Sequence, residues 1–346
     1  MENVLIKELS LENLDIYLKF LNEIGWKSTR QDVLKAFKVY RETGYSTVYV
    51  ASYGGNVIGR VLLDTVYPPY AEIVNLYVHP DYRNKGIGSK LVKECIKKAE
   101  EKGHYIIYLM CDPTDLKIHK FYERLGFTPV IFDRKKRNDI WLYFFGSKSF
   151  VREFINLHSF VEKRALKYKP IFYGEKLYAI YYTDPLTRET LKIFFKGQPG
   201  QPIKSGIMPR IVAVAYNTRD LNIVAWVEEN DKRISLVEPA EFTLYIRNLG
   251  NSIVKVLPKP LTSPELSIEG SFNKIYLNPG EKLNMLYKLN IERKEFIKLV
   301  EFLSFPTIIA SIELLISGFC MEYINANGGL SFLILAVNSL GLNMSI

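Results

Sequence analysis

The stretch VHPDYRNKGIG, residues 78–88, decides how the first part of this chain folds. An apolar run ends at Val78, a polar loop follows, and a helix is expected to begin at Gly86 and Gly88. Glycine has no Cβ atom, so a ligand can approach the backbone closely here. The first N–H groups of a helix lack intrahelical partners and carry partial positive charge. Together with Arg83 and Lys85, the stretch predicts a strand–loop–helix unit that holds a diphosphate.

Further strands and helices are predicted outward from this stretch. Apolar runs between turn residues predict strands, and helical spacing with capping residues predicts helices. In chain order these are a strand at 4–8, helices at 11–24 and 29–42, strands at 47–53, 57–63 and 73–78, a helix at 88–102, a strand at 105–110, a helix at 115–125, and strands at 127–132 and 140–145. This order predicts a mixed sheet with helices on both faces.

The pattern changes after Gly146. Residues 150–167 are expected to form a connecting helix, and from Pro170 onward short apolar runs separated by turn residues predict a β-sandwich or barrel. Two turn segments, at 248–250 and 277–281, weakly resemble those of immunoglobulin-like modules. We therefore expect an α+β chain with three parts: residues 1–147 with the mixed sheet, 148–235 with the connector and a small antiparallel region, and 236–346 with a sandwich-like domain.

Composition narrows the classes of function. Apolar residues make up 48% of the chain and charged residues 24%, which favours a folded protein over a disordered one. The net charge of +9 is spread along the chain, which suits an anionic ligand and is only a weak argument for nucleic acid as a partner. The three cysteines and four histidines have no metal-ligand spacing, so no metal is expected and a reducing cytoplasm is favoured.

The two terminal segments bear on localisation, and the composition bears on the source organism. The N-terminus lacks a signal-peptide pattern. The uncharged residues 323–346 are interrupted by Asn and Ser, so we expect buried strands and no membrane span. The scarcity of Gln beside abundant Lys, Glu and Ile is typical of a thermophilic source.

The loop at 83–88 resembles the Arg/Gln-x-x-Gly-x-Gly/Ala loop of the GNAT superfamily of N-acetyltransferases, and FYERLGF at 121–127 resembles that family's second signature. The order of elements in residues 1–147 is similar as well. This resemblance implies acetyl-CoA as donor, with its pyrophosphate on the loop and its pantetheine arm beside strand 76–78. Asp115 stands where many members have Asn, which places its contact with CoA in doubt. The residues implied to bind acetyl-CoA are Leu76, Tyr77, Val78, Arg83, Asn84, Lys85, Gly86, Ile87, Gly88 and Asp115.

The same resemblance suggests two residues for proton transfer. Tyr122 occupies the position of a general acid for the departing thiolate, and the alternative is a tyrosine of the core. Glu72, in the stretch AEIV, resembles the base of the histone acetyltransferase branch, and the alternative is an exposed glutamate at a strand edge. The basic turn Arg134–Arg137 either steers an acidic acceptor or is an ordinary solvated turn.

The leading hypothesis is direct transfer of an acetyl group to an amine, with a protein N-terminus, a lysine, a polyamine and a small amine all left open. The β-rich half would recognise the acceptor, close the site or form a homo-oligomer. One alternative is a non-catalytic module that binds acetyl-CoA while the β-rich half mediates interaction. Another is an acetyltransferase associated with nucleic acid, which the net charge motivates.

Overall fold

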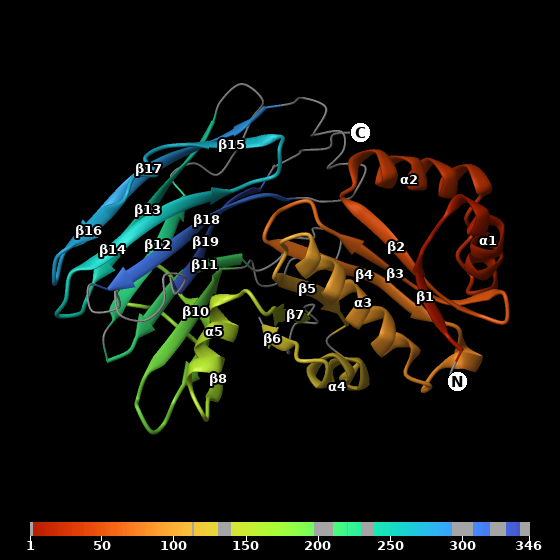
Figure 1. The fold of residues 1–346 in the computed structure, drawn as a ribbon, viewed down its shortest axis with the longest axis horizontal. Coiled ribbons are helices and arrows are strands. Elements are labelled where there is room, and N and C mark those ends of the chain that lie inside the picture. The colour runs from red at the N-terminus through yellow and green to blue at the C-terminus, as the bar shows by residue number, and fades with distance from the viewer. Residues whose placement is uncertain are drawn as a thin grey trace. The chain divides into compact units, whose positions relative to one another are not determined.

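The computed structural model describes residues 3–112, 114–130, 140–196, 210–219, 221–229, 239–292, 307–318 and 330–339 (Figure 1). The chain forms two compact units. The first contains Met1–Cys111, Leu116–Thr128 and Leu142–Gly146, and the second contains Asp112–Asp115, Pro129–Trp141 and Ser147–Ile346.

A seven-stranded mixed sheet organises the first unit. Its strands are β1 (Leu5–Glu8), β2 (Ser46–Tyr53), β3 (Asn56–Asp64), β4 (Tyr70–Val78), β5 (Ile106–Cys111), β6 (Thr128–Val130) and β7 (Ile140–Phe145), in the spatial order β1-β2-β3-β4-β5-β7-β6. The first four strands pair antiparallel, and β4 pairs parallel with β5. The predicted mixed sheet is confirmed.

Four helices pack on this sheet: α1 (Leu14–Glu23), α2 (Arg30–Thr43), α3 (Ile87–Glu101) and α4 (Leu116–Arg124). The order of strands and helices is the one predicted from the sequence. Thr29 and Asp32 form a capping box at the start of α2, because the Thr29 side chain accepts from the Asp32 N–H and the Asp32 carboxylate accepts from the Thr29 N–H. Local capping therefore sets where this helix begins.

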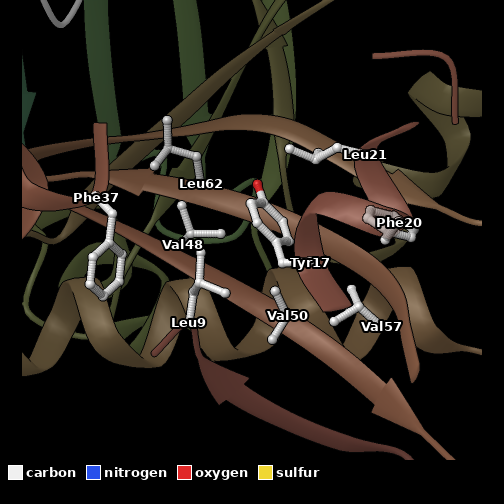
Figure 2. Close-up of a cluster of buried hydrophobic side chains, with 9 residues drawn as sticks. All are labelled: Leu9, Tyr17, Phe20, Leu21, Phe37, Val48, Val50, Val57 and Leu62. Carbon is white, nitrogen blue, oxygen red and sulfur yellow. The ribbon is translucent and has the colours of Figure 1, made fainter. Parts of the chain in front are cut away.

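Opposite faces of the sheet carry different helices. Helices α1 and α2 cover a cluster of buried residues that includes Tyr17, Phe37 and Val48 (Figure 2). On β3, Arg60 lies beside Tyr17 of α1, whereas a Cβ on the neighbouring Gly59 would contact Ile87 and Leu91 of α3. Because successive residues of a strand point to opposite faces, α3 covers the face opposite α1 and α2.

The second unit begins with helix α5 (Phe150–Leu157) and continues as antiparallel strands. The strands are β8 (Glu162–Tyr168), β9 (Leu177–Thr183), β10 (Thr190–Lys196), β11 (Arg210–Asn217), β12 (Asn222–Glu229), β13 (Ala240–Asn248), β14 (Val254–Leu261), β15 (Leu266–Glu269), β16 (Ile275–Leu277), β17 (Lys282–Ile291), β18 (Thr307–Gly318) and β19 (Leu330–Ser339). An eight-stranded sheet has the order β15-β17-β13-β12-β11-β10-β9-β8, and a four-stranded sheet has the order β16-β14-β18-β19. Strand β19 packs against β11 and β12. The expected α+β chain with a β-rich second part is confirmed.

The eight-stranded sheet takes strands from both sides of residue 235. Strand β12 pairs with β13 along its length, from Ile223 opposite Asn248 to Glu229 opposite Phe242. The sheet is therefore continuous across the position where the sequence analysis separates its second and third parts.

One helix was predicted too long. The segment 150–167 was expected to be helical throughout, but α5 ends at Leu157 and residues 162–168 form β8. Its sequence EKRALKY consists mainly of helix-favouring residues. Pairing with β9, from Glu162 opposite Thr183 to Tyr168 opposite Leu177, overrides that local preference. The charged side chains suit its place at the edge of the sheet.

The two turn segments that resemble immunoglobulin-like modules lie together. The Asn248 N–H donates to the Glu281 carbonyl at 3.0 Å, and the Gly280 N–H donates to the Asn248 carbonyl at 3.0 Å. The buried Asn248 side chain also donates to the Leu277 carbonyl at 3.0 Å. A single asparagine thus ties both turns together, and the resemblance itself stays a prediction.

The apolar C-terminal runs form strands, as expected. Residues 308–316 lie in β18 and residues 332–337 lie in β19, and these two strands pair antiparallel. Among the helices that the structure describes, none has both the length and the apolar character that crossing a membrane requires.

Candidate active site

The predicted phosphate loop joins β4 to α3. After a short turn at Pro80–Tyr82, Asn84 and Gly86 adopt positive φ angles of 61° and 78°. Gly86 is the N-cap of α3, it provides no side-chain cap, and no atom lies within 4 Å of the position that its Cβ would occupy. The N–H groups of the first turn of α3, which includes Ile87 and Gly88, are therefore open to an external acceptor.

The two basic residues of the loop also hold its shape. Arg83 Nε donates to the Val78 carbonyl at 3.0 Å, and the guanidinium lies 5.3 Å from the centre of the Tyr77 ring. Lys85 Nζ donates to the Asp81 carbonyl at 2.8 Å. Both side chains keep a positive charge beside the start of α3, and their bonds to the loop backbone were not anticipated from the sequence.

Strands β4 and β5 separate just before this loop. Their parallel pairing joins Tyr70, Ala71 and Glu72 to residues 106–108 and goes no further along these two described strands. Beyond it, β4 bulges, because Leu62 lies opposite Val74 whereas Arg60 lies opposite Tyr77. Asn75 within the bulge has a φ of 54°. The residues Leu76, Tyr77 and Val78 thus follow the point of separation, as the implied position of a pantetheine arm requires.

Glu72 belongs to a row of polar residues across four strands. Strand register places Ser46 opposite Asp64, Asp64 opposite Glu72, and Glu72 opposite Tyr108. The Tyr108 hydroxyl donates to Glu72 Oε2 at 3.3 Å, and the Ser46 hydroxyl donates to the Asp64 carboxylate. The row lies at Glu72, the last residue of β4 that pairs with β5, and on the sheet face that carries α1 and α2. Glu72 is therefore not the exposed edge residue of the alternative interpretation, since β4 lies inside the sheet.

The surroundings of this row favour protonated carboxyl groups. Burial, followed by the nearby Asp64 carboxylate, raises the pKa of Glu72 to about 8, although the hydrogen bond from Tyr108 lowers it. Burial raises the pKa of Asp64 to about 7, and the Ser46 hydroxyl and Arg60 oppose this. A carboxylate with a pKa near 8 accepts a proton from an amine much more readily than an ordinary glutamate does.

Tyr122 lies in α4 and is buried. Its ring packs edge-on against Phe121 and Phe127, with ring centres 4.9 and 5.6 Å away. Burial, with smaller contributions from Cys111 and Cys95, raises the pKa of Tyr122 well above its usual value. Tyr122 interacts with Cys111 of β5, whereas Glu72 interacts with Tyr108 three residues earlier, so the two side chains lie on opposite faces of the sheet. This arrangement is compatible with both a catalytic and a core role for Tyr122.

The remaining predicted residues contribute less to this site. Asp115 is half-buried directly before α4, and its N–H donates to the Asp112 carbonyl at 3.3 Å. Its contact with CoA stays a prediction. The basic turn Arg134–Arg137 lies outside the described residues. Within the described part of the chain, no three His, Cys, Asp or Glu residues gather as metal ligands would.

Sequence reasoning missed three residues of this face: Arg60, Asp64 and Tyr108. The signal was present in β3, where two charged residues, Arg60 and Asp64, lie an even number of positions apart in the otherwise apolar segment VIGRVLLD, residues 57–64. Such alternation places both charges on one face of a strand. The face is the one that also carries Glu72.

Comparison with known proteins finds similarity to one family in the first unit. Residues 13–127 match the acetyltransferase (GNAT) family. The chain is similar to an uncharacterised N-acetyltransferase of Methanocaldococcus jannaschii, with 39% identity over 57 residues, which cover 16% of this chain and 25% of that protein. It is also similar to an uncharacterised N-acetyltransferase of Archaeoglobus fulgidus, with 29% identity over 99 residues, which cover 27% of this chain and 67% of that protein. The chain thus spans only about a quarter of the first relative.

Solved structures with a likeness to this chain include two acetyltransferases. A PaiA N-acetyltransferase from Thermoplasma acidophilum in complex with coenzyme A is 19% identical, with a TM-score of 0.35 and coverage of 41% of this chain and 99% of that one. The ribosomal-protein-S18-alanine N-acetyltransferase from Escherichia coli is 16% identical, with a TM-score of 0.32 and coverage of 40% and 90%.

Proposed function

Since residues 13–127 form a GNAT acetyltransferase domain, we propose that this chain transfers the acetyl group of acetyl-CoA directly to an amine acceptor. One observation carries the proposal: β4 and β5 separate immediately beyond Glu72, and the phosphate loop begins at the end of the same β4 strand. A base, a gap for a thioester and an anion-binding helix end are thus arranged along one strand.

The donor site suits a diphosphate on a long arm. Gly86 and Asn84 turn the backbone with positive φ, and α3 begins without a side-chain cap. A Cβ on Gly88 would lie 3.4 Å from the Phe121 ring, so the start of the helix packs against α4 at van der Waals distance. Arg83 and Lys85 add positive charge beside this helix end. The backbone of Leu76, Tyr77 and Val78 would lie beside the arm and offer an N–H group to the thioester carbonyl.

Glu72 would accept a proton from the attacking amine, directly or through a water molecule. A lysine ammonium has a pKa of about 10.4, so proton transfer to an ordinary glutamate costs about 8 kcal/mol. With the pKa of Glu72 raised to about 8, the same transfer costs about 3 kcal/mol. For an α-amine, with a pKa of about 7.7–8.0, the transfer is nearly neutral in free energy. The environment of Glu72 therefore matches the task of an amine base.

Tyr122 would act at the sulfur. Because burial raises its pKa, its phenol keeps its proton at neutral pH and donates a hydrogen bond to the departing thiolate. The acid and the base would then act from opposite faces of the sheet. No covalent enzyme intermediate is needed, and buried Cys95, whose thiol pKa burial raises, is unsuited as a nucleophile.

The test is release of the CoA thiol, followed with a thiol reagent, from acetyl-CoA and a panel of amines. The panel contains a peptide with a free N-terminus, an Nα-blocked lysine, a polyamine and short alkylamines. We expect amine-dependent release whose rate rises with pH through about 8, as Glu72 loses its proton. Binding of acetyl-CoA without release for any amine would contradict the proposal and leave the non-catalytic module.

A further inference from the structure

A cavity lies beneath helices α1 and α2. Its volume is about 230 Å³, and its walls come from α1, α2, β2, β3 and the turn after α1. Figure 2 shows several of its apolar wall residues, among them Tyr17, Leu21 and Phe37, gathered between the helices and the sheet. An apolar cavity in this position needs no ligand by itself, but one residue in its wall carries a full charge.

That residue is Arg60 of β3. Its side chain is buried, with 6% of the residue exposed, and its Nε atom has no hydrogen-bond partner. The guanidinium lies 4.9 Å from the centre of the Trp26 ring and 5.8 Å from that of Tyr17. No described residue forms a hydrogen bond or ion pair with it. A guanidinium group stays protonated in proteins, so Arg60 remains charged although it is buried.

The nearest acids do not neutralise Arg60. Asp64 lies on the same face of β3, but its carboxylate accepts from the Ser46 hydroxyl, and burial raises its pKa to about 7. Asp32 also lines the cavity, but it is exposed at the start of α2, and its carboxylate accepts from Thr29. Asp64 and Arg60 interact electrostatically, but no described residue forms an ion pair or hydrogen bond with the guanidinium, although buried charges in proteins are normally paired.

The face that contains this cavity is electrically polarised. Strand register places Arg60 opposite Tyr77 and Asp64 opposite Glu72, so Arg60 and the Asp64–Glu72 pair lie four residues apart along β3 and, across the bulge, five along β4. At the rise of a strand this is a separation of about 13 Å between backbones. One end of the face therefore attracts an anion, and the other end holds the two acids that attract an amine.

We infer that the amine acceptor of the proposed reaction carries a carboxylate, which Arg60 binds in this cavity while the amine reaches Glu72. The inference rests on the proposed function and specifies its acceptor class: an elongated molecule with an amine at one end and a carboxylate at the other. A planar guanidinium that lies beside two aromatic rings can present its N–H groups to a carboxylate in the bidentate geometry that such pairs prefer.

The test compares acceptors that differ only in charge. Small probes are γ-aminobutyrate, ε-aminocaproate and aminocaprylate, each paired with its neutral amide. Peptide probes are C-terminally amidated Ala-Ala-Glu and Ala-Ala-Gln. We expect one carboxylate probe to exceed its neutral partner about 30-fold in kcat/KM. Success in the first set identifies a small amino acid, and success in the second identifies a polypeptide N-terminus.

Variants of Arg60 assign this preference to the cavity. Arg60→Met should remove the preference for the carboxylate probe and leave kcat/KM for the neutral probes within about twofold. Arg60→Lys should keep part of the preference, because the positive charge remains but the bidentate geometry of the guanidinium is lost. Arg41→Met is the matched control, since Arg41 also stacks on an aromatic ring, 5.8 Å from that of Phe37, but is exposed and does not line this cavity. Equal losses for charged and neutral probes in Arg60→Met, or a preference unchanged in it, would overturn the inference.

A binding measurement separates this inference from the proposed reaction. Tryptophan fluorescence, with Trp26→Phe to assign the signal, reports carboxylate binding in the absence of acetyl-CoA. Saturable quenching by the preferred carboxylate that Arg60→Met abolishes would support the cavity even if no amine is acetylated. Acetylation of neutral amines without any carboxylate binding would overturn the cavity and leave the proposed function intact.

Discussion

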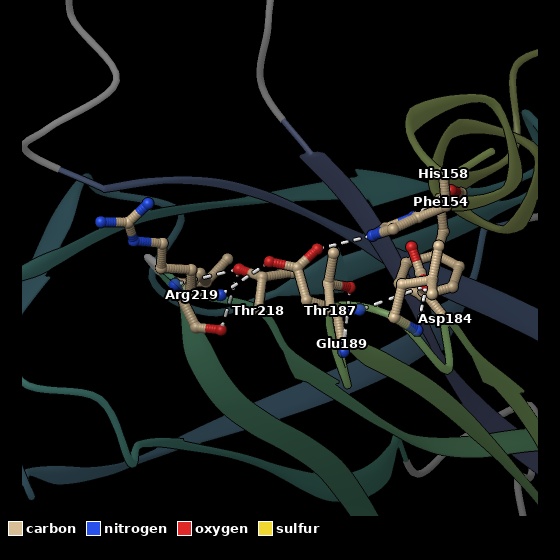
Figure 3. A network of polar contacts seen from close by, with 9 residues as sticks. Phe154, His158, Asp184, Thr187, Glu189, Thr218 and Arg219 are labelled. Carbon is tan, nitrogen blue, oxygen red and sulfur yellow. Dashed lines mark hydrogen bonds and ion pairs between the residues drawn. The ribbon is translucent and has the colours of Figure 1, made fainter. Parts of the chain in front are cut away.

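The two compact units treat buried charge in opposite ways. In the first, Arg60 is buried without a hydrogen bond or ion pair among the described residues. In the second, His158 is also buried, but its Nδ1 lies 2.7 Å from the Phe154 carbonyl and its Nε2 lies 2.5 Å from the Glu189 carboxylate (Figure 3). Both acceptors need a donor, so the ring is doubly protonated and fully paired. The charge of His158 is thus paired within the protein, whereas that of Arg60 is the one that we propose to bind a carboxylate.

The network around His158 extends this contrast. The second oxygen of Glu189 accepts from the Arg219 N–H at 2.8 Å, and Asp184 accepts from the Leu186 N–H at 2.8 Å (Figure 3). Burial lowers the pKa of His158, but its hydrogen bonds to Phe154 and Glu189 raise it more. Strands, turns and helix α5 are thus joined by satisfied polar groups, in contrast to Arg60, whose Nε atom has no partner.

The largest expected effect is loss of donor binding in Gly86→Glu. A carboxylate at the start of α3 repels the diphosphate, and we expect acetyl-CoA binding to weaken about 10³-fold or more in calorimetry. Gly55→Glu is the control, because Gly55 has a φ of 79° against 78° for Gly86, and neither Cβ position has an atom within 4 Å. Equal binding by the two variants would show that the loop is not the donor site.

Glu72→Gln should lower kcat by about 10²- to 10⁴-fold for a lysine acceptor. The wild-type rate should rise with pH through about 8, and this inflection should disappear in the variant. The variant should also be the more stable protein at alkaline pH. A carboxyl whose pKa is raised by folding from 4.5 to about 8 destabilises the fold progressively as pH rises between these two values, and Gln removes this loss. An unchanged pH profile would exclude Glu72 as the base.

Tyr122→Phe should lower kcat by about 10- to 100-fold, the value of one hydrogen bond to a charged group. The packing against Phe121 and Phe127 is preserved, so the melting temperature should change little. Tyr49→Phe is the control, because Tyr49 is a buried tyrosine of β2 with a raised pKa and no proposed role in transfer. Equal activity in the two variants would leave Tyr122 as a core residue.

The smallest effect on activity is expected for Glu189→Gln, which tests the paired charge of the second unit. Chemical denaturation should show a loss of about 1–2 kcal/mol near pH 6, with acetyl transfer unchanged. Because folding raises the pKa of His158, the stabilisation is complete below about 6.5 and is lost as pH rises through the folded pKa, so the variant and wild type should converge in alkali. Glu162→Gln, in an exposed pair with Arg164, should change nothing. A loss that persists in alkali would show that His158 is not charged.

Local signals were sufficient for most elements of the first unit. Thr29 and Asp32 marked the start of α2, and the glycines at 86 and 88 marked that of α3. Local signals failed at residues 162–168, where helix-favouring residues form an edge strand. The sequence also could not show that β12 and β13 join one sheet across residue 235, because pairing depends on partners distant in the chain.

The sequence by itself was enough to predict the proposed donor side of this protein. A strand, a loop with two glycines and a helix are contiguous, so the 11 residues 78–88 contain every local feature of the proposed anion site. Only the tertiary structure decided the acceptor side. Arg60, Asp64, Glu72 and Tyr108 come from three strands, and strand register alone brings them onto one face. The raised pKa values of Asp64 and Glu72 arise from burial, and Arg60 is buried beside Tyr17 of α1 and Trp26, which no local pattern contains.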